Sequence, residues 1–136
     1  MKTNYKIFLA GLAPLGSILP FVYTFLYAFD LSSVRTLSLQ FIPLYLPIIF
    51  GVWNVLYFHT LRKWFPRNQN RRLWIAGIIL GFILGLVEVY VVKLPERALG
   101  MTGVMVYIPI FIAPVFFGAL WRYVVKWFNA FFEIKD

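Results

Sequence analysis

Four long apolar segments alternate with short polar segments along the chain. The apolar segments cover residues 7–29, 41–61, 73–92 and 104–125. Each is long enough for a helix that crosses a bilayer, which needs about 20 largely apolar residues. Residues 75–87 and 104–119 carry no charge on any helical face, whereas the helices of a soluble bundle present a polar face to water. The pattern predicts an all-α integral membrane protein with four transmembrane helices.

The two halves of the chain share residues at matching positions. A segment of about 1–66 resembles a segment of about 67–136, with an offset close to 66 positions. The matches are Ala10-Gly11 with Ala76-Gly77, Ile42-Pro43 with Ile108-Pro109, Pro47-x-x-Phe50-Gly51 with Pro114-x-x-Phe117-Gly118, Gly16 with Gly81, and Trp53-Asn54 with Trp121-Arg122. We predict one transmembrane domain, residues 1–136, built from two tandem hairpin repeats. Because each repeat contains two helices, both cross the membrane in the same sense and are parallel repeats. Chance similarity between apolar helices is the alternative.

The basic residues are distributed unevenly between the two predicted sides of the membrane. The chain has 13 Lys and Arg residues and a net charge of +8. Ten of them lie in the two terminal regions and in the loop around residues 62–72, and three lie in the other two loops. The positive-inside rule then places both termini in the cytoplasm. We expect a multi-pass protein of a bacterial inner (plasma) membrane, and the charge needs no nucleic-acid partner to explain it.

Prolines interrupt three of the four apolar segments. We expect helix bends at Pro14, Pro20, Pro47, Pro109 and Pro114, because proline removes a backbone hydrogen bond and its ring clashes with the preceding turn. Bent helices would open a cavity toward the outer side near Glu88. The alternative is that proline is simply more frequent in transmembrane helices than in soluble ones. The first apolar segment follows two lysines, as in a signal peptide, but it exceeds the usual length of about 7–15 residues, so we expect it to be retained.

Three glycines share one face of the third helix. Gly77, Gly81 and Gly85 recur every four residues, a motif that lets another helix approach closely within lipid. Two interpretations stay open. The face packs against another helix of the same chain, or it forms a homo-oligomer interface.

A few polar residues interrupt the apolar segments. Glu88 lies near the outer end of its helix, where it is either an interfacial anchor or a site residue for a cation or proton. Asn54 and Arg122 lie in the inner half, where they either meet around a lipid phosphate or anion, or make an interhelical hydrogen bond and a snorkelling contact separately. His59, the only histidine, has no nearby acid or cysteine and predicts neither a metal site nor a catalytic dyad.

The sequence carries no recognisable set of catalytic, cofactor-binding or metal-ligating residues. The favoured hypothesis is a non-enzymatic subunit or accessory protein of a membrane complex. The alternative is a small ion or solute transporter or channel that works as a homo-oligomer, with Glu88 in the pathway. An intramembrane enzyme acting on a lipid or quinone is a third, less favoured class. The expected partners are the lipid bilayer and other membrane subunits, or a second copy bound through the face of Gly77, Gly81 and Gly85.

Overall fold

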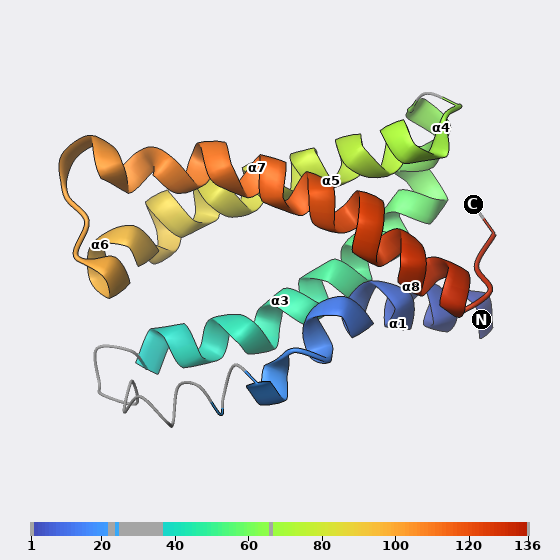
Figure 1. The fold of residues 1–136 in the computed structure, drawn as a ribbon, viewed down its shortest axis with the longest axis horizontal. Helices are drawn as coiled ribbons and strands as arrows, with labels where there is room; N and C mark the ends of the chain where they lie inside the picture. Colours follow the sequence, from blue (N-terminus) through green and yellow to red (C-terminus); the bar gives the residue numbers. More distant parts are fainter. Residues whose placement is uncertain (1, 22–23, 25–36, 66, 136) are drawn as a thin grey trace.

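Two helical hairpins make up the fold (Figure 1). The computed structural model describes residues 2–21, 24, 37–65 and 67–135. In the first hairpin α1 (Lys2–Gly16) pairs with α3 (Leu37–Leu56), and in the second α5 (Gln69–Leu86) pairs with α7 (Ile108–Leu120). No strand occurs among the described residues. The prediction of an all-α fold with four main helices is confirmed.

Three of the main helices continue through a π-helical turn. They extend into η2 (Tyr57–Leu61), η3 (Val87–Val92) and η5 (Trp121–Val125). Short α-helices follow two of these turns: α4 (Arg62–Trp64) after η2, and α8 (Lys126–Phe131) after η5. In the second hairpin, α6 (Leu94–Leu99) and the 3-10 helix η4 (Gly103–Tyr107) make the connection between α5 and α7.

The predicted helix over residues 7–29 is interrupted after Gly16. A turn follows at residues 17–18, and residues 19–21 form one further helical turn. Pro20 explains the interruption, because it has no N–H to donate to the carbonyl four residues earlier. The backbone instead makes shorter-range bonds, from the Ile18 N–H to Leu15 O at 3.1 Å and from the Phe21 N–H to Ile18 O at 3.0 Å.

Two helices of the described part of the chain are long and apolar enough to cross a membrane. They are the continuous helical stretches Gln69–Val92 and Gly103–Phe131. They agree with the third and fourth predicted segments, 73–92 and 104–125. Both belong to the second hairpin.

The hairpins meet around a cluster of aromatic rings. The ring centroid of Phe50 lies 5.4 Å from that of Phe117 and 5.0 Å from that of Trp121. All three side chains are buried. The indole N–H of Trp53 adds a polar link by donating to Ala76 O at 3.1 Å. The core therefore joins the middle of α3 to the middle of the second hairpin.

Both chain ends lie at the same end of the molecule as the polar segment that joins the hairpins (Figure 1). At this end α1 contacts α8, so the first and last helices of the chain are neighbours. The α6–η4 connection lies at the opposite end. The arrangement brings the basic termini and the basic segment around residues 62–72 together.

Candidate functional site

The two hairpins are held together internally by equivalent glycine contacts. A Cβ added to Gly11 would lie 2.5 Å from the backbone oxygen of Phe50, and one added to Gly77 would lie 2.4 Å from that of Phe117. These distances are too short for any side chain, so only glycine allows the helices to approach this closely. The paired residues are offset by 66 and 67 positions. The residue matches between the halves thus correspond to matching contacts in space.

The same contacts show which residues of the two hairpins occupy equivalent positions. The Gly11 Cβ position lies 2.6 Å from Asn54 Cβ, and the Gly77 Cβ position lies 2.7 Å from Trp121 Cβ. Asn54 therefore corresponds to Trp121, and not to Arg122 as the match of two tryptophans suggested. The predicted register was displaced by one residue at this point.

The three-glycine face of α5 packs against α7 of the same chain. A Cβ on Gly81 would lie 2.5 Å from Ala113 O, and a Cβ on Gly85 would lie 3.0 Å from Ile110 Cα. The face formed by these glycines and Gly77 is thus occupied within the hairpin and leaves no room there for a second copy. Of the two interpretations, the arrangement favours packing within the chain.

Gly16 has no comparable role in the first hairpin. Among the described residues, a Cβ at this position would meet only Leu12 Cδ2 of the same helix, at 3.1 Å. The sequence match of Gly16 with Gly81 is therefore not a match in contacts.

A buried pair of asparagines joins the two hairpins. The Nδ2 group of Asn54 donates to Asn129 Oδ1 at 2.9 Å and to Ile7 O at 2.8 Å. Asn54 is fully buried and Asn129 is 5% exposed. The bonds tie α3 to both α1 and α8. Sequence reasoning missed Asn129, whose only signal is a polar side chain within the aromatic stretch that follows Trp127.

Arg122 does not meet Asn54. Its guanidinium carbon lies 5.2 Å from the ring centroid of Tyr123, and the side chain is half-buried along two adjoining cavities. Since Asn54 binds Asn129 instead, the structure does not gather these two predicted site residues into one place.

Glu88 lies apart from both. It is half-buried in the first turn of η3, toward the end of the second hairpin that carries α6. The backbone N–H of Lys93 donates to the Glu88 carbonyl and closes the π-helical turn, with Lys93 itself in the left-handed region at φ 53°. The predicted polar residues thus occupy three separate locations.

The five predicted bend residues fall into two groups. Pro14 and Pro114 lie inside α1 and α7, and Pro47 lies within the bounds of α3. Pro109 lies in the first turn of α7, directly after the 3-10 helix η4 and within the continuous stretch Gly103–Phe131. Pro20 lies beyond the end of α1. The bends at these prolines stay predictions.

A cavity of about 600 Å³ lies where the two chain ends meet. Its lining includes Lys6, Arg62 and Glu133, so charges of both signs surround it. The ring of His59 is hydrogen-bonded through Nε2 to Asn4 Oδ1 at 2.8 Å. Among the described residues no group of three or more His, Cys, Asp or Glu side chains is placed to hold a metal ion.

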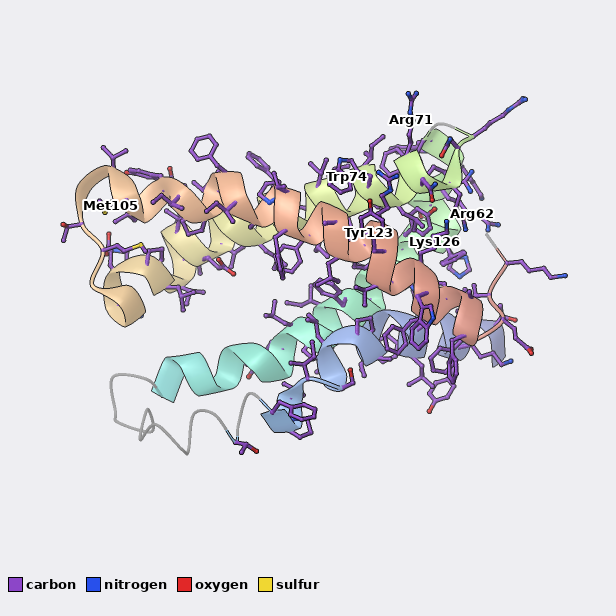
Figure 2. All side chains as sticks on the ribbon, viewed as in Figure 1. Arg62, Arg71, Trp74, Met105, Tyr123 and Lys126 are labelled. Carbon is purple, nitrogen blue, oxygen red and sulfur yellow. The ribbon has the colours of Figure 1, made fainter. Side chains whose placement is uncertain are left out.

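A second basic region lies beside it on the second hairpin. Two adjoining cavities of about 460 and 390 Å³ share Asn70 and Arg122 in their linings. They run between the start of α5 and the stretch formed by η5 and α8. Figure 2 shows Arg71 and Trp74 from one side of this region and Tyr123 and Lys126 from the other.

Comparison with known proteins gives no relative for the chain. A scan against protein-family models finds no match, and searches of curated proteins and of solved structures find no significant similarity.

Proposed function

We propose that the chain is an integral membrane protein that serves as a non-enzymatic subunit or accessory protein of a membrane complex. The membrane placement is supported by how little of the apolar helices is covered. In the most apolar stretches of Gln69–Val92 and Gly103–Phe131, 39% and 22% of the residues are buried. A core helix of a soluble protein would be mostly buried, and soluble monomers rarely expose large contiguous apolar patches.

The outward face of α7 shows what must be covered. Phe111 is 75% exposed and Val115 is 61% exposed, and they lie one helical turn apart with Ile112 and Phe116 beside them. Two kinds of surroundings can cover such a face: lipid tails, or an apolar helix of a neighbouring protein.

The observation that carries the subunit assignment is the filled space between the hairpins. Phe50, Phe117 and Trp121 occupy it, with ring centroids 5.0 and 5.4 Å apart. Trp121 and Phe50 are fully buried. A route for an ion or solute through one copy would have to displace these rings. Packing of this kind supports a structural role for the single chain.

In the proposed topology both termini are cytoplasmic, in a bacterial inner membrane, and the hairpins are parallel tandem repeats. The support is that the two termini and the segment around residues 62–72, where the basic residues concentrate, lie at one end of the molecule (Figure 1). Positive charge concentrated at one end favours retention of that end in the cytoplasm.

The test is the composition of the complex that contains the chain in its native membrane. Gentle extraction followed by native mass spectrometry should give a mass that includes other polypeptides. The Glu88→Gln variant should assemble in the same complex, and liposomes containing the purified chain should show no ion or solute flux that depends on Glu88.

A homo-oligomer whose flux is abolished by Glu88→Gln would overturn the subunit proposal in favour of the transporter or channel. The observation behind this second candidate is the location of Glu88 at the end of the hairpin away from the aromatic cluster, where a pathway would have to be built from several copies.

A further inference from the structure

The two adjoining cavities on the second hairpin form a groove with an unusual charge. We call it the basic groove. It is defined by Asn70, Arg71, Trp74, Arg122, Lys126 and Trp127. Three of these residues are cationic, and no aspartate or glutamate is among the described residues that line either cavity. The larger cavity near the termini differs in this respect, because Glu133 is part of its lining. The basic groove is therefore the better place for an anion.

The cations of the basic groove are positioned by different elements. Lys126 Nζ donates to Asn70 Oδ1 at 2.8 Å, which holds α8 against the start of α5. Arg122 lies over the ring of Tyr123, 5.2 Å from its centroid. Neither the Arg122 nor the Arg71 guanidinium group has a hydrogen-bond acceptor among the described residues. These two groups therefore retain their donors for a ligand.

The neighbouring Arg72 serves as a contrast. Its guanidinium group donates to Tyr57 OH at 3.4 Å and to Arg67 O at 3.1 Å, which links the two hairpins. Arg72 therefore has a structural role. The guanidinium groups of Arg71 and Arg122 differ from that of Arg72 because they make no such bonds among the described residues.

Two tryptophans border the cations: Trp74 lies about one helical turn beyond Arg71 along α5, and Trp127 directly follows Lys126. Trp74 is half-buried, while Trp127 is 61% exposed and stacks on Phe131 at 5.8 Å between ring centroids. Tryptophan is enriched where the headgroups of a bilayer meet its hydrocarbon region. Guanidinium groups bind phosphate oxygens in pairs, and an ammonium group adds a point charge. The combination matches the phosphate and upper acyl region of a lipid.

We propose, building on the membrane placement proposed above, that the basic groove binds the phosphate group of an anionic membrane lipid. Arg71 and Arg122 donate to the phosphate oxygens, Lys126 contributes charge while anchored by Asn70, Trp74 contacts the glycerol and the start of the acyl chains, and Trp127 borders the headgroup. Basic pockets between helices on the cytoplasmic side are a known way to hold anionic headgroups.

The experiment measures lipid retention by the full chain in mixed bilayers. The protein is reconstituted into nanodiscs of phosphatidylglycerol in a phosphatidylcholine background, released in the mass spectrometer, and scored for bound phosphatidylglycerol. Each basic residue near an anionic surface contributes about tenfold or less to binding, so Arg122→Gln with Lys126→Gln should lower retention on the order of tenfold to thirtyfold. Arg122→Lys, which keeps the charge, should recover part of the loss.

The matched control is Lys63→Gln with Arg67→Gln, which removes two exposed charges outside the groove. It should leave retention unchanged, and an equal loss in this control would overturn the proposal in favour of diffuse surface charge. Inorganic phosphate alone serves as the second probe. Displacement of the lipid by millimolar phosphate would show that the groove takes free phosphate instead.

Failure of the lipid site can be told apart from failure of the membrane assignment. Extraction of the chain from membranes by alkaline carbonate would contradict the membrane placement itself. A chain that resists carbonate but shows equal retention of phosphatidylglycerol and phosphatidylcholine would overturn the lipid site alone.

Discussion

The two hairpins differ in how far their close packing extends. In the first, α1 ends at Gly16 and the residues beyond it turn away from a regular helix. In the second, Gly81 and Gly85 of α5 extend the close contact with α7 that begins at Gly77. The helical stretch that begins with α5 continues to Val92. The glycine contact that the two hairpins share is therefore followed by further close contacts in the second hairpin. Close packing over a longer distance makes the second hairpin the more regular of the two.

The hairpins also differ at the position next to the shared glycine contact. The first hairpin has Asn54, which makes two hydrogen bonds, and the second has Trp121, whose Nε1 group is buried without a partner among the described residues. One hairpin uses this position for polar attachment to its neighbour. The other uses it for ring packing against Phe50. The same close approach of two helices thus supports a hydrogen-bonded interface at Asn54 and an aromatic interface at Trp121.

The largest expected effect tests whether the glycine contacts are equivalent. Gly11→Ala and Gly77→Ala should each lower the free energy of unfolding by about 1–3 kcal/mol, because the added Cβ meets backbone atoms that cannot move aside. Unfolding in mixed micelles with increasing dodecyl sulfate measures the change. Gly16→Ala is the matched control and should be nearly neutral, since its Cβ would meet only the end of a leucine side chain. Tolerance of alanine at one of the two sites alone would break the equivalence.

A smaller effect is expected from the polar attachment of the first hairpin. Asn54→Leu and Asn129→Leu should each cost about 0.6–1.7 kcal/mol, the range of interhelical hydrogen bonds in membranes. The double variant should cost clearly less than the sum, because both substitutions remove the same bond.

The second hairpin provides the control for this double-mutant cycle of Asn54 and Asn129. Trp121→Phe combined with Asn129→Leu should be additive, since Trp121 Nε1 makes no bond that could be shared. Coupling of similar size in both cycles would contradict the distinction between Asn54 and Trp121.

The smallest effect concerns the interruption of the first hairpin. Residue Leu86 stands in the second hairpin where Pro20 stands in the first, at the offset of 66, and the helix there is continuous. Pro20→Leu should therefore extend α1 beyond Gly16 and slow amide hydrogen exchange at residues 17–21. The gain in stability should be well below the about 3 kcal/mol that proline costs in a helix interior, because the helix already ends here. Unchanged exchange would show that another feature ends α1.

Several features of the fold could be predicted because they depend on local sequence. The helix Gln69–Val92 follows from an apolar run without a breaker, and Pro20 gives a local reason for the end of α1. The interruption was missed because a bend and a break have the same sequence signal.

The candidate sites were harder to predict because they depend on pairing across the chain. Arg122 was singled out from the sequence, but Asn70 was not, and Asn70 binds Lys126 from 56 residues away. Asn129 was missed as the partner of Asn54 for the same reason, with 75 residues between them.

The sequence by itself determined the helical class and the clustering of basic charge, and it predicted a repeat of about 66 residues, because each is a property of residue order and spacing. Only the tertiary structure decided which residues occupy equivalent places, that α7 covers the glycine face, and that Asn54 turns to Asn129 and away from Arg122. A shift of one residue rotates a helical side chain by about 100°, so a register that spacing leaves open is settled by contacts such as those of Gly11 and Gly77.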